Sequence, residues 1–208
     1  HWAGVNPQTG AAMWYTDETL TETTENVRSE AKQFYTGKSA TPSAFGGLNT
    51  YLSYKGFELS AQVVFVWDKY IWDNQGKGVS SDGARAPRST YLYSFENRWT
   101  TLGQESLLPI FVWGNTSRSN EKYQTRYLYD ASYIRLRDIT LSYMFGKSIT
   151  DRVKISSLKL FVKANNYLTW VREEGDRLRI DPEAGINGVI NGIVPKTKSL
   201  TVGVNIGF

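Results

Sequence analysis

The stretch that decides the fold of this chain is KSLTVGVNIGF, Lys198–Phe208. Apolar residues alternate in it with small or polar residues without a break. Successive side chains of a strand point to opposite faces, so the stretch predicts a strand with one apolar face and one small or polar face. Its length also suits a tilted strand that crosses a bilayer, which takes about 9–11 residues. The apolar face would carry Leu200, Val202, Val204, Ile206 and Phe208.

The composition of the 208 residues excludes several kinds of active site. There is no Cys and the single His is residue 1, which argues against Cys/His zinc sites, thiol catalysis, disulfide frameworks and a Ser-His-Asp triad. The net charge of +4 comes from scattered basic residues, whereas a nucleic-acid surface needs them clustered on one face. No apolar run approaches the roughly 18–20 residues of a transmembrane helix. We therefore expect no enzyme, no cofactor, no metal site and no nucleic-acid partner.

Four further segments alternate in the same way as the C-terminal stretch. With the last strand at about 198–208, the predicted strands lie at about 44–54, 57–67, 133–145 and 157–170. The dipeptide Lys55-Gly56 between the first two suits a tight two-residue hairpin turn. In the third, the apolar phase slips near Arg137 and Asp138. Either a one-residue bulge restores the phase there, or the strand leaves the lipid and its charges lie at the headgroups.

The connections between these strands are alternately long and short. The long ones cover about 5–43, 68–131 and 171–197, and the short ones are Lys55-Gly56 and Gly146–Ser156. This alternation is typical of outer-membrane barrels, which have long outer loops and short periplasmic turns. Such barrels need at least about 8 strands, so five strands must be completed by further polypeptide. The predicted fold class is all-β, a transmembrane antiparallel β-barrel to which this chain contributes C-terminal strands, and residues 1–4 read like the end of a preceding strand.

Several stretches, in this order and spacing, resemble the C-terminal end of the SusC/RagA family of TonB-dependent outer-membrane transporters. They are GVNPQTGAAMWY (Gly4–Tyr15), GGLNTYLSYKGFELS (Gly46–Ser60), SYIRLRDITLSY (Ser132–Tyr143), NNYLTW (Asn165–Trp170), DPEAG (Asp181–Gly185) and PKTKSLTVGVNIGF (Pro195–Phe208). Two features depart from the family pattern. Lys196 and Lys198 stand where the family would have Arg at least once, and the segment 68–131 matches nothing in it. Because substrate identity would reside in that segment, the resemblance does not specify the substrate.

The resemblance implies a barrel of about 22 strands filled by an N-terminal plug that lies outside this chain. It implies a SusD-like surface lipoprotein as a lid, energy delivered by the TonB complex through the plug, and import of oligosaccharides or peptides across the outer membrane of a Gram-negative bacterium. The work of this chain would be passive, as wall and outer loops. A secreted carbohydrate-binding β-sandwich and a non-transporting barrel, such as an adhesin or porin, are the alternatives.

Four aromatic residues of the longest loop are candidates for contact with substrate or lid, because aromatic faces stack on sugar rings and fill peptide pockets. They are Tyr70, Trp72, Trp99 and Trp113. Trp67 and Trp170, at strand ends, suit an interfacial aromatic girdle instead.

Other candidates follow from the strand faces and the chain end. The polar face of the fourth strand predicts Lys159, Lys163, Asn165 and Tyr167 toward the barrel lumen, where they would contact water, the plug or an anionic solute. Phe208 resembles the terminal aromatic residue that the barrel-assembly machinery reads. Asp181 and Glu183, with Pro182 between them, indicate a turn rather than the paired carboxylates of a glycosidase.

Overall fold

The computed structural model describes residues 1–26, 29–80, 82–84, 91–116, 119–120, 124–173, 180–185, 187–192 and 194–208. They form two compact units. The sheet unit comprises Ser39–Tyr70, Asp130–Ala184 and Ile193–Phe208, and the loop unit comprises His1–Lys38, Ile71–Tyr129 and Gly185–Gly192. Within the described residues, no helix has both the length and the apolar character that crossing a membrane would require.

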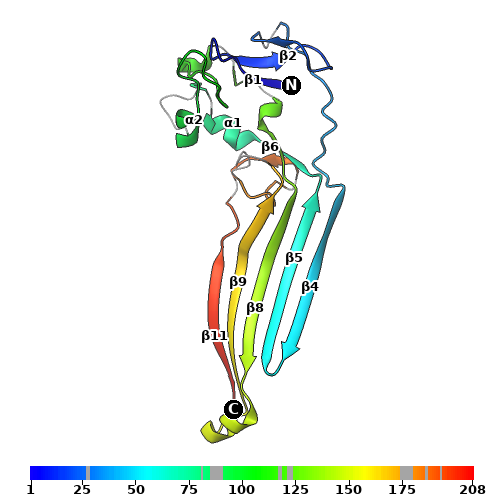
Figure 1. Ribbon diagram of the computed structural model, residues 1–208, viewed down its shortest axis with the longest axis vertical. Helices are drawn as coiled ribbons and strands as arrows, with labels where there is room; N and C mark the ends of the chain where they lie inside the picture. Colours follow the sequence, from blue (N-terminus) through cyan, green and yellow to red (C-terminus); the bar gives the residue numbers. More distant parts are fainter. Residues whose placement is uncertain are drawn as a thin grey trace. The chain divides into compact units, whose positions relative to one another are not determined.

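The sheet unit is built on a five-stranded antiparallel sheet, seen side by side in Figure 1. Each strand pairs with the sheet strand that precedes or follows it in the chain, so the sheet is a meander. The strand ranges agree closely with those predicted from alternation. They are β4 (Ala44–Tyr54), β5 (Phe57–Trp67), β8 (Tyr133–Met144), β9 (Ser157–Val171) and β11 (Ser199–Gly207).

The register gives the whole sheet two chemically distinct faces. One row of paired residues across all five strands is Leu52, Leu59, Leu141, Val162 and Val202. The next row is Tyr51, Ser60, Thr140, Lys163 and Thr201. Because neighbouring residues of a strand point to opposite faces, most of the apolar residues of the five strands share one face.

The apolar face is open rather than covered by another layer. Leu200, Val202 and Val204 are 60%, 72% and 52% exposed, and Leu52 and Leu141 are 61% and 50% exposed. A β-sandwich would bury such residues between two sheets. The exposure therefore disfavours the sandwich alternative.

The predicted hairpin turn is confirmed, and of the two alternatives for the phase slip the structure has the bulge. Lys55 and Gly56 have φ of 46° and 87°, and Tyr54 pairs directly with Phe57, as in a two-residue hairpin whose central residues have positive φ. The β5–β8 register shifts between Gln62 and Val63, because β8 holds one extra residue at Arg137. This bulge keeps the apolar residues of both halves of β8 on one face.

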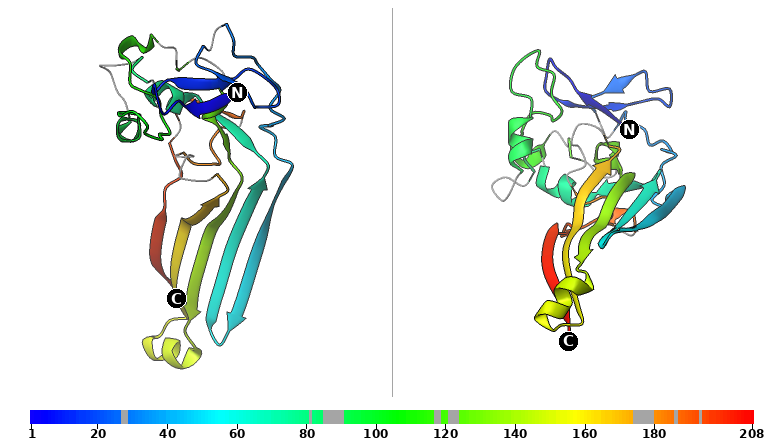
Figure 2. Two further views of the ribbon diagram at one scale, coloured as in Figure 1. Left: turned by 45° about the horizontal axis from the view of Figure 1, so that its top comes forward. Right: turned by 60° about the horizontal axis from the view of Figure 1, so that its bottom comes forward.

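The short connection after β8 is helical. It forms α3 (Lys147–Thr150) and η3 (Asp151–Val153), which end at Lys154 in the left-handed conformation. Both lie at the same end of the sheet as the C-terminus (Figures 1 and 2).

The loop unit has small sheets and helices of its own. β1 (Trp2–Val5), β2 (Ala12–Tyr15) and β3 (Thr23–Thr24) form one sheet. β6 (Tyr70–Asp73), β7 (Leu128–Asp130) and β10 (Val189–Ile190) form a second. The helices are α1 (Asn74–Ser80), α2 (Leu92–Glu96), η1 (Trp113–Asn115) and η2 (Thr125–Tyr127).

The core of the loop unit contains both apolar and charged side chains. Ile71 and Ile190 are fully buried, and Trp14 is nearly so. The buried Arg126 guanidinium donates to both oxygens of Asp82, at 2.6 and 2.9 Å, so the buried charges are paired. The described parts of the long loops around residues 5–43 and 68–131 are thus folded.

Candidate functional site

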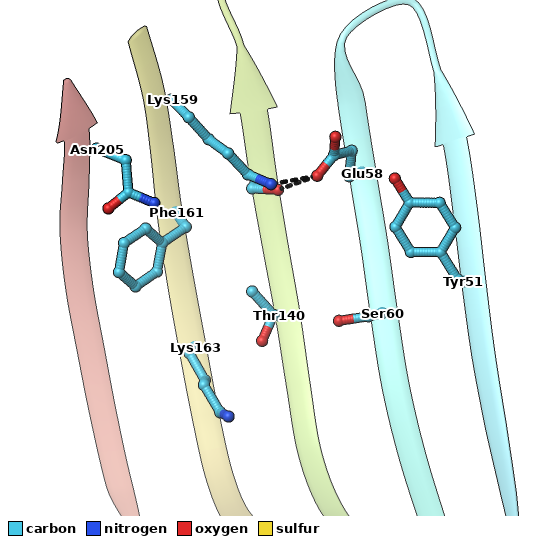
Figure 3. Close-up of a pocket in the computed structure, with 9 residues that line it drawn as sticks. Tyr51, Glu58, Ser60, Thr140, Lys159, Phe161, Lys163 and Asn205 are labelled. Atoms are coloured by element: carbon cyan, nitrogen blue, oxygen red, sulfur yellow. Dashed lines mark hydrogen bonds and ion pairs between the residues drawn. The ribbon is translucent and has the colours of Figure 1, made fainter. Parts of the chain in front are cut away.

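The polar face of the sheet carries a shallow hollow of about 320 Å³, shown in Figure 3. All five strands contribute to it, because the register brings the polar residues of each strand to the same face. Its lining residues are Tyr51, Glu58, Ser60, Thr140, Ser142, Lys159, Phe161, Lys163 and Asn205.

An ion pair across β8 organises one end of this hollow. The Lys159 ammonium pairs with the Glu58 carboxylate, and the Ser142 hydroxyl donates to the same carboxylate oxygen at 3.2 Å (Figure 3). Lys159 and Glu58 remain 28% and 23% exposed, so solvent screens the attraction between them. Within the described residues Lys163 forms no ion pair, which leaves the hollow with a net positive charge.

Gly203 on β11 leaves room for the side chain of Phe161, which lies on the polar face of the neighbouring strand β9. Phe161 pairs with Gly203, and a Cβ on that glycine would lie 2.3 Å from the Phe161 ring. Any larger residue at position 203 would displace the ring from the hollow.

The four lumen-facing candidates do not gather in one place. Lys159 and Lys163 line the hollow. Asn165 lies beyond it, where its Nδ2 donates to Ser199 Oγ at 3.0 Å, and Tyr167 is 46% exposed. Sequence reasoning missed Glu58 as the partner of Lys159. The alternation in β5 placed Glu58 on the polar face, but only the register brings it opposite Ser142.

A second charged cluster holds the Asp181–Glu183 turn against β8. Arg135 Nη2 donates to Asp181 at 2.7 Å, and Arg135 Nη1 lies 3.2 Å from Glu183. Arg137 donates to Glu183 at 2.9 Å, as does the Tyr133 hydroxyl at 2.8 Å, and the Lys196 ammonium pairs with the same carboxylate. The expected turn is confirmed, and its carboxylates serve as ion-pair anchors.

Burial and ion pairing act in opposite directions on Glu183. Burial raises the pKa of its carboxyl, but the hydrogen bonds from Lys196, Tyr133 and Arg137 outweigh burial and bring that pKa down from 4.5 to about 2. Burial likewise raises the pKa of Asp181, but the hydrogen bonds from Arg135 and from the Glu183 and Lys196 amides together outweigh burial and lower that pKa. Both carboxylates therefore remain charged at neutral pH.

The four aromatic candidates occupy different environments. Trp99 packs within the loop unit, where its Nε1 donates to the Pro7 carbonyl at 3.0 Å and a Cβ on Gly10 would lie 2.4 Å from its ring. Trp72 is half-buried on β6, whereas Trp113 is 68% exposed in η1. Tyr70, in the sheet unit, is half-buried. None of the four lines the hollow of the polar face.

Two tryptophans stack near the opposite end of the sheet from the hairpin turn. The rings of Trp67 and Trp170 lie 6.3 Å apart at an interplanar angle of 15°, and Arg172 lies 4.9 Å from the Trp67 ring. They are 39% and 52% exposed. Amphipathic aromatic rings backed by a cation are suited to a membrane–water boundary.

The remaining candidates concern the chain end and metals. Phe208 is 96% exposed and follows the last strand. In the described part of the chain, no three His, Asp or Glu residues lie close enough together to hold a metal ion.

Comparison with known proteins gives relatives of one kind. No family model matches the chain. TonB-dependent receptors P3 and P26 of Formosa agariphila are 24% and 25% identical to it over 183 and 185 residues, which cover 81% and 82% of the chain. The matches cover 16% and 17% of those receptors, so the chain spans about a sixth of the length of these relatives.

Solved structures agree with the sequence relatives. The RagAB peptide transporter matches the whole chain with a TM-score of 0.74 and 26% identity, over 22% of its own chain. The RagAB peptide importer in its "open-open" state matches with a TM-score of 0.72 at 24% identity, which bears on the fold alone. Together these matches support the identification of the chain as a segment of a SusC/RagA-like TonB-dependent transporter.

Proposed function

We propose that this chain forms part of the wall and outer loops of a TonB-dependent importer in the bacterial outer membrane. The observation that carries the proposal is the open apolar face of the five-stranded sheet. Soluble proteins rarely expose a contiguous apolar patch larger than a few hundred Å². In a membrane barrel the apolar face would contact lipid hydrocarbon and the polar face would line the lumen, which explains why the two faces differ.

The edges of the sheet support completion by further strands. In the described residues, β4 and β11 each pair on one side only, so their outer edges leave backbone N–H and C=O groups unpaired. Each such group costs several kcal/mol in hydrocarbon. We propose that the remaining strands of a barrel of about 22 strands pair with both edges.

The direction of the chain through the membrane follows from its connections. The two-residue turn at Lys55-Gly56 and the α3–η3 connection would lie in the periplasm, and the loop unit would lie outside the cell. Trp67 and Trp170 would then mark the outer boundary of the hydrocarbon, and Phe208 would end the last strand at the periplasmic boundary as the signal for barrel assembly.

The partners that we propose are those of a TonB-dependent importer with a lid. A plug would fill the lumen beside the positively charged hollow, the TonB complex would act through the plug, and a SusD-like lipoprotein would cover the outer loops. The substrate would be a peptide or an oligosaccharide. The peptide transporter RagAB is among the similar structures, which supports the peptide.

Energy-dependent uptake tests the proposal. Cells that carry the full-length protein would be given fluorescently labelled peptides and oligosaccharides, with and without TonB. We expect uptake of one class that stops when TonB is deleted or the proton gradient is collapsed. Uptake that continues without TonB would favour a passive porin, and the absence of the protein from the outer membrane would contradict the proposal altogether.

A further inference from the structure

The two short connections of the sheet lie beside each other at one of its ends. They are the hairpin turn Lys55-Gly56 and the segment Gly146–Ser156, which contains α3 and η3. The main-chain N–H of Met144, the last residue of β8, donates to the Gly56 carbonyl at 2.7 Å, so the hairpin turn borders the start of the second connection. We call these two connections together the turn end of the sheet (Figure 1).

Most of the excess positive charge of the chain lies at the turn end. The whole chain has an excess of four basic over acidic residues. The turn end carries four basic side chains and one acidic side chain, which is an excess of three. All five are exposed, and none forms an ion pair with another described residue. They are Lys55, Lys147, Arg152, Lys154 and the acidic Asp151.

Two of these lysines occupy backbone positions that suit other residues better. Lys55 and Lys154 have φ of 46° and 57°, in the left-handed region that glycine, asparagine and aspartate enter more easily. Glycine, asparagine or aspartate is also what a two-residue hairpin turn prefers at the position of Lys55. The backbone conformation therefore does not explain why a lysine stands at either position.

The cation of Lys55 lies against the apolar face of the sheet. Its Nζ is 5.2 Å from the centre of the Tyr54 ring. Tyr54 shares the apolar face with Leu52, two residues earlier on β4, and is 70% exposed. A cation held over a ring at the end of a lipid-facing surface is suited to the boundary between hydrocarbon and headgroups.

Further aromatic rings lie at the same end of the apolar face. The Phe57 ring, which follows the hairpin turn, lies 4.6 Å from the Tyr143 ring, and the Tyr143 ring lies 4.9 Å from that of Phe145. These rings come from the residues of β5 and β8 that adjoin the two connections. The basic side chains of the turn end thus follow directly on the aromatic end of the apolar face.

The second connection combines apolar and basic side chains on its exposed surface. Ile149 and Val153 are 44% and 58% exposed, and a spacing of four residues places them on the same side of the helical segment. Thr150 is only 2% exposed, so it faces the rest of the sheet unit. Lys147 and Arg152 supply charge near the apolar pair. A helical segment with this distribution is suited to lie in the interfacial plane of a membrane.

We propose that the turn end binds the phosphate headgroups of anionic phospholipids in the inner leaflet of the outer membrane, an inference that rests on the proposed function. In the orientation proposed above, both connections lie at the periplasmic surface, where lipid phosphates complement the excess of basic side chains. Ile149 and Val153 would enter the boundary between headgroups and acyl chains.

A nitroxide label on α3 tests the proposal in the full-length protein. Ser148 is exposed on α3, and the present chain contains no cysteine, so Ser148→Cys provides one labelling site once any cysteine elsewhere in the protein is replaced. The labelled protein would be placed in nanodiscs of phosphatidylcholine with increasing fractions of phosphatidylglycerol. Electron paramagnetic resonance would measure the accessibility of the nitroxide to a water-soluble nickel complex.

We expect the accessibility of the nitroxide to fall as the fraction of phosphatidylglycerol rises, and 1 M salt should weaken this response. The Lys55→Gly and Lys154→Gly variants each remove a cation and introduce the residue that the backbone conformation favours, so both turns should still form. In each variant the phosphatidylglycerol fraction at half-maximal protection should rise about 2- to 5-fold, the effect of one basic residue near an anionic surface.

Lys198→Gln is the matched control, because Lys198 is an exposed lysine that precedes β11 at the opposite end of the sheet. Its response to phosphatidylglycerol should equal that of the wild type. An equal shift in this control and in the two glycine variants would overturn the inference.

Two further results would overturn the inference and leave the importer standing. One is a nitroxide that stays fully accessible at every phosphatidylglycerol fraction. The other is a nitroxide that is already protected in pure phosphatidylcholine and does not respond to phosphatidylglycerol, because a protein segment such as the plug would then cover α3. Uptake that continues without TonB would instead overturn the proposed import mechanism alone, since a passive barrel would present the same turn end to lipid.

Discussion

Substitutions of two neighbouring residues on β11 test which face of the sheet contacts lipid. Val204 is 52% exposed on the apolar face, and its neighbour Asn205 lies on the polar face opposite Lys159. Val204→Lys should cost roughly 2–4 kcal/mol near the membrane midplane and lower the amount of assembled protein in the outer membrane. Asn205→Lys should be tolerated better, because a charge on the polar face stays in contact with water and not with hydrocarbon. Equal outer-membrane levels of the wild type and Val204→Lys would contradict the lipid-facing assignment.

At this scale the sequence predicts the face of a residue but not its partner. Alternation alone predicts Lys159 and Lys163 on the polar face, and both line the hollow there. The Lys159–Glu58 pair depends on the register of three strands and on the length of a lysine side chain. A local sequence pattern does not specify the register, so the Lys159–Glu58 pair could be identified only from the structure of the sheet.

Among the elements, the Asp181–Glu183 turn depends on one buried arginine. Arg135 is 4% exposed and touches both carboxylates. Arg135→Leu would leave buried carboxylates with fewer cations, which typically costs about 3–5 kcal/mol. Hydrogen exchange should then be much faster at the Ala184 amide, which donates to the Asp181 carbonyl at 2.9 Å. Arg137 is 43% exposed, so Arg137→Leu should cost at most about 1 kcal/mol and barely change that exchange.

The same turn should respond to acid but not to mild changes of pH. Since the folded pKa of Glu183 is about 2, below its ordinary value of 4.5, the ionised carboxylate stabilises the turn fully above pH 4.5. This stabilisation should decline as the pH falls from about 4.5 to about 2. Exchange at the Ala184 amide, corrected for its intrinsic pH dependence, would follow the change. Glu183→Gln should weaken the acid response, and a midpoint near neutrality in the wild type would rule out this origin.

Elements formed by residues close in the sequence are predicted well, whereas elements formed by residues far apart in the sequence are not. The hairpin at Lys55-Gly56 and the bulge at Arg137 follow from local turn chemistry and from a slip in periodicity. The β6–β10 pair joins two short segments more than a hundred residues apart, and neither alternates long enough to predict a strand. The sequence therefore did not predict this pair.

For the molecule as a whole, the area of the exposed apolar face of the sheet decides how the protein behaves in water. Most of the exposed apolar residues of the five strands lie on one face, and the stacked Trp67 and Trp170 stand at one end of it. Because burying apolar surface is worth about 25 cal/mol per Å², an uncovered face of this kind drives association with lipid, detergent or another copy.

The full-length protein should therefore require detergent or lipid to remain monodisperse. Light scattering during stepwise dilution of detergent below its critical micelle concentration would show large aggregates, and transfer into lipid nanodiscs should prevent them. Phospholipids brominated near the headgroup should quench the fluorescence of the wild type more than that of a Trp67→Phe, Trp170→Phe double variant, since those two rings would lie at the hydrocarbon boundary. A protein that stays monodisperse without detergent would instead return the carbohydrate-binding sandwich to consideration, because its apolar face would then have to be covered by protein.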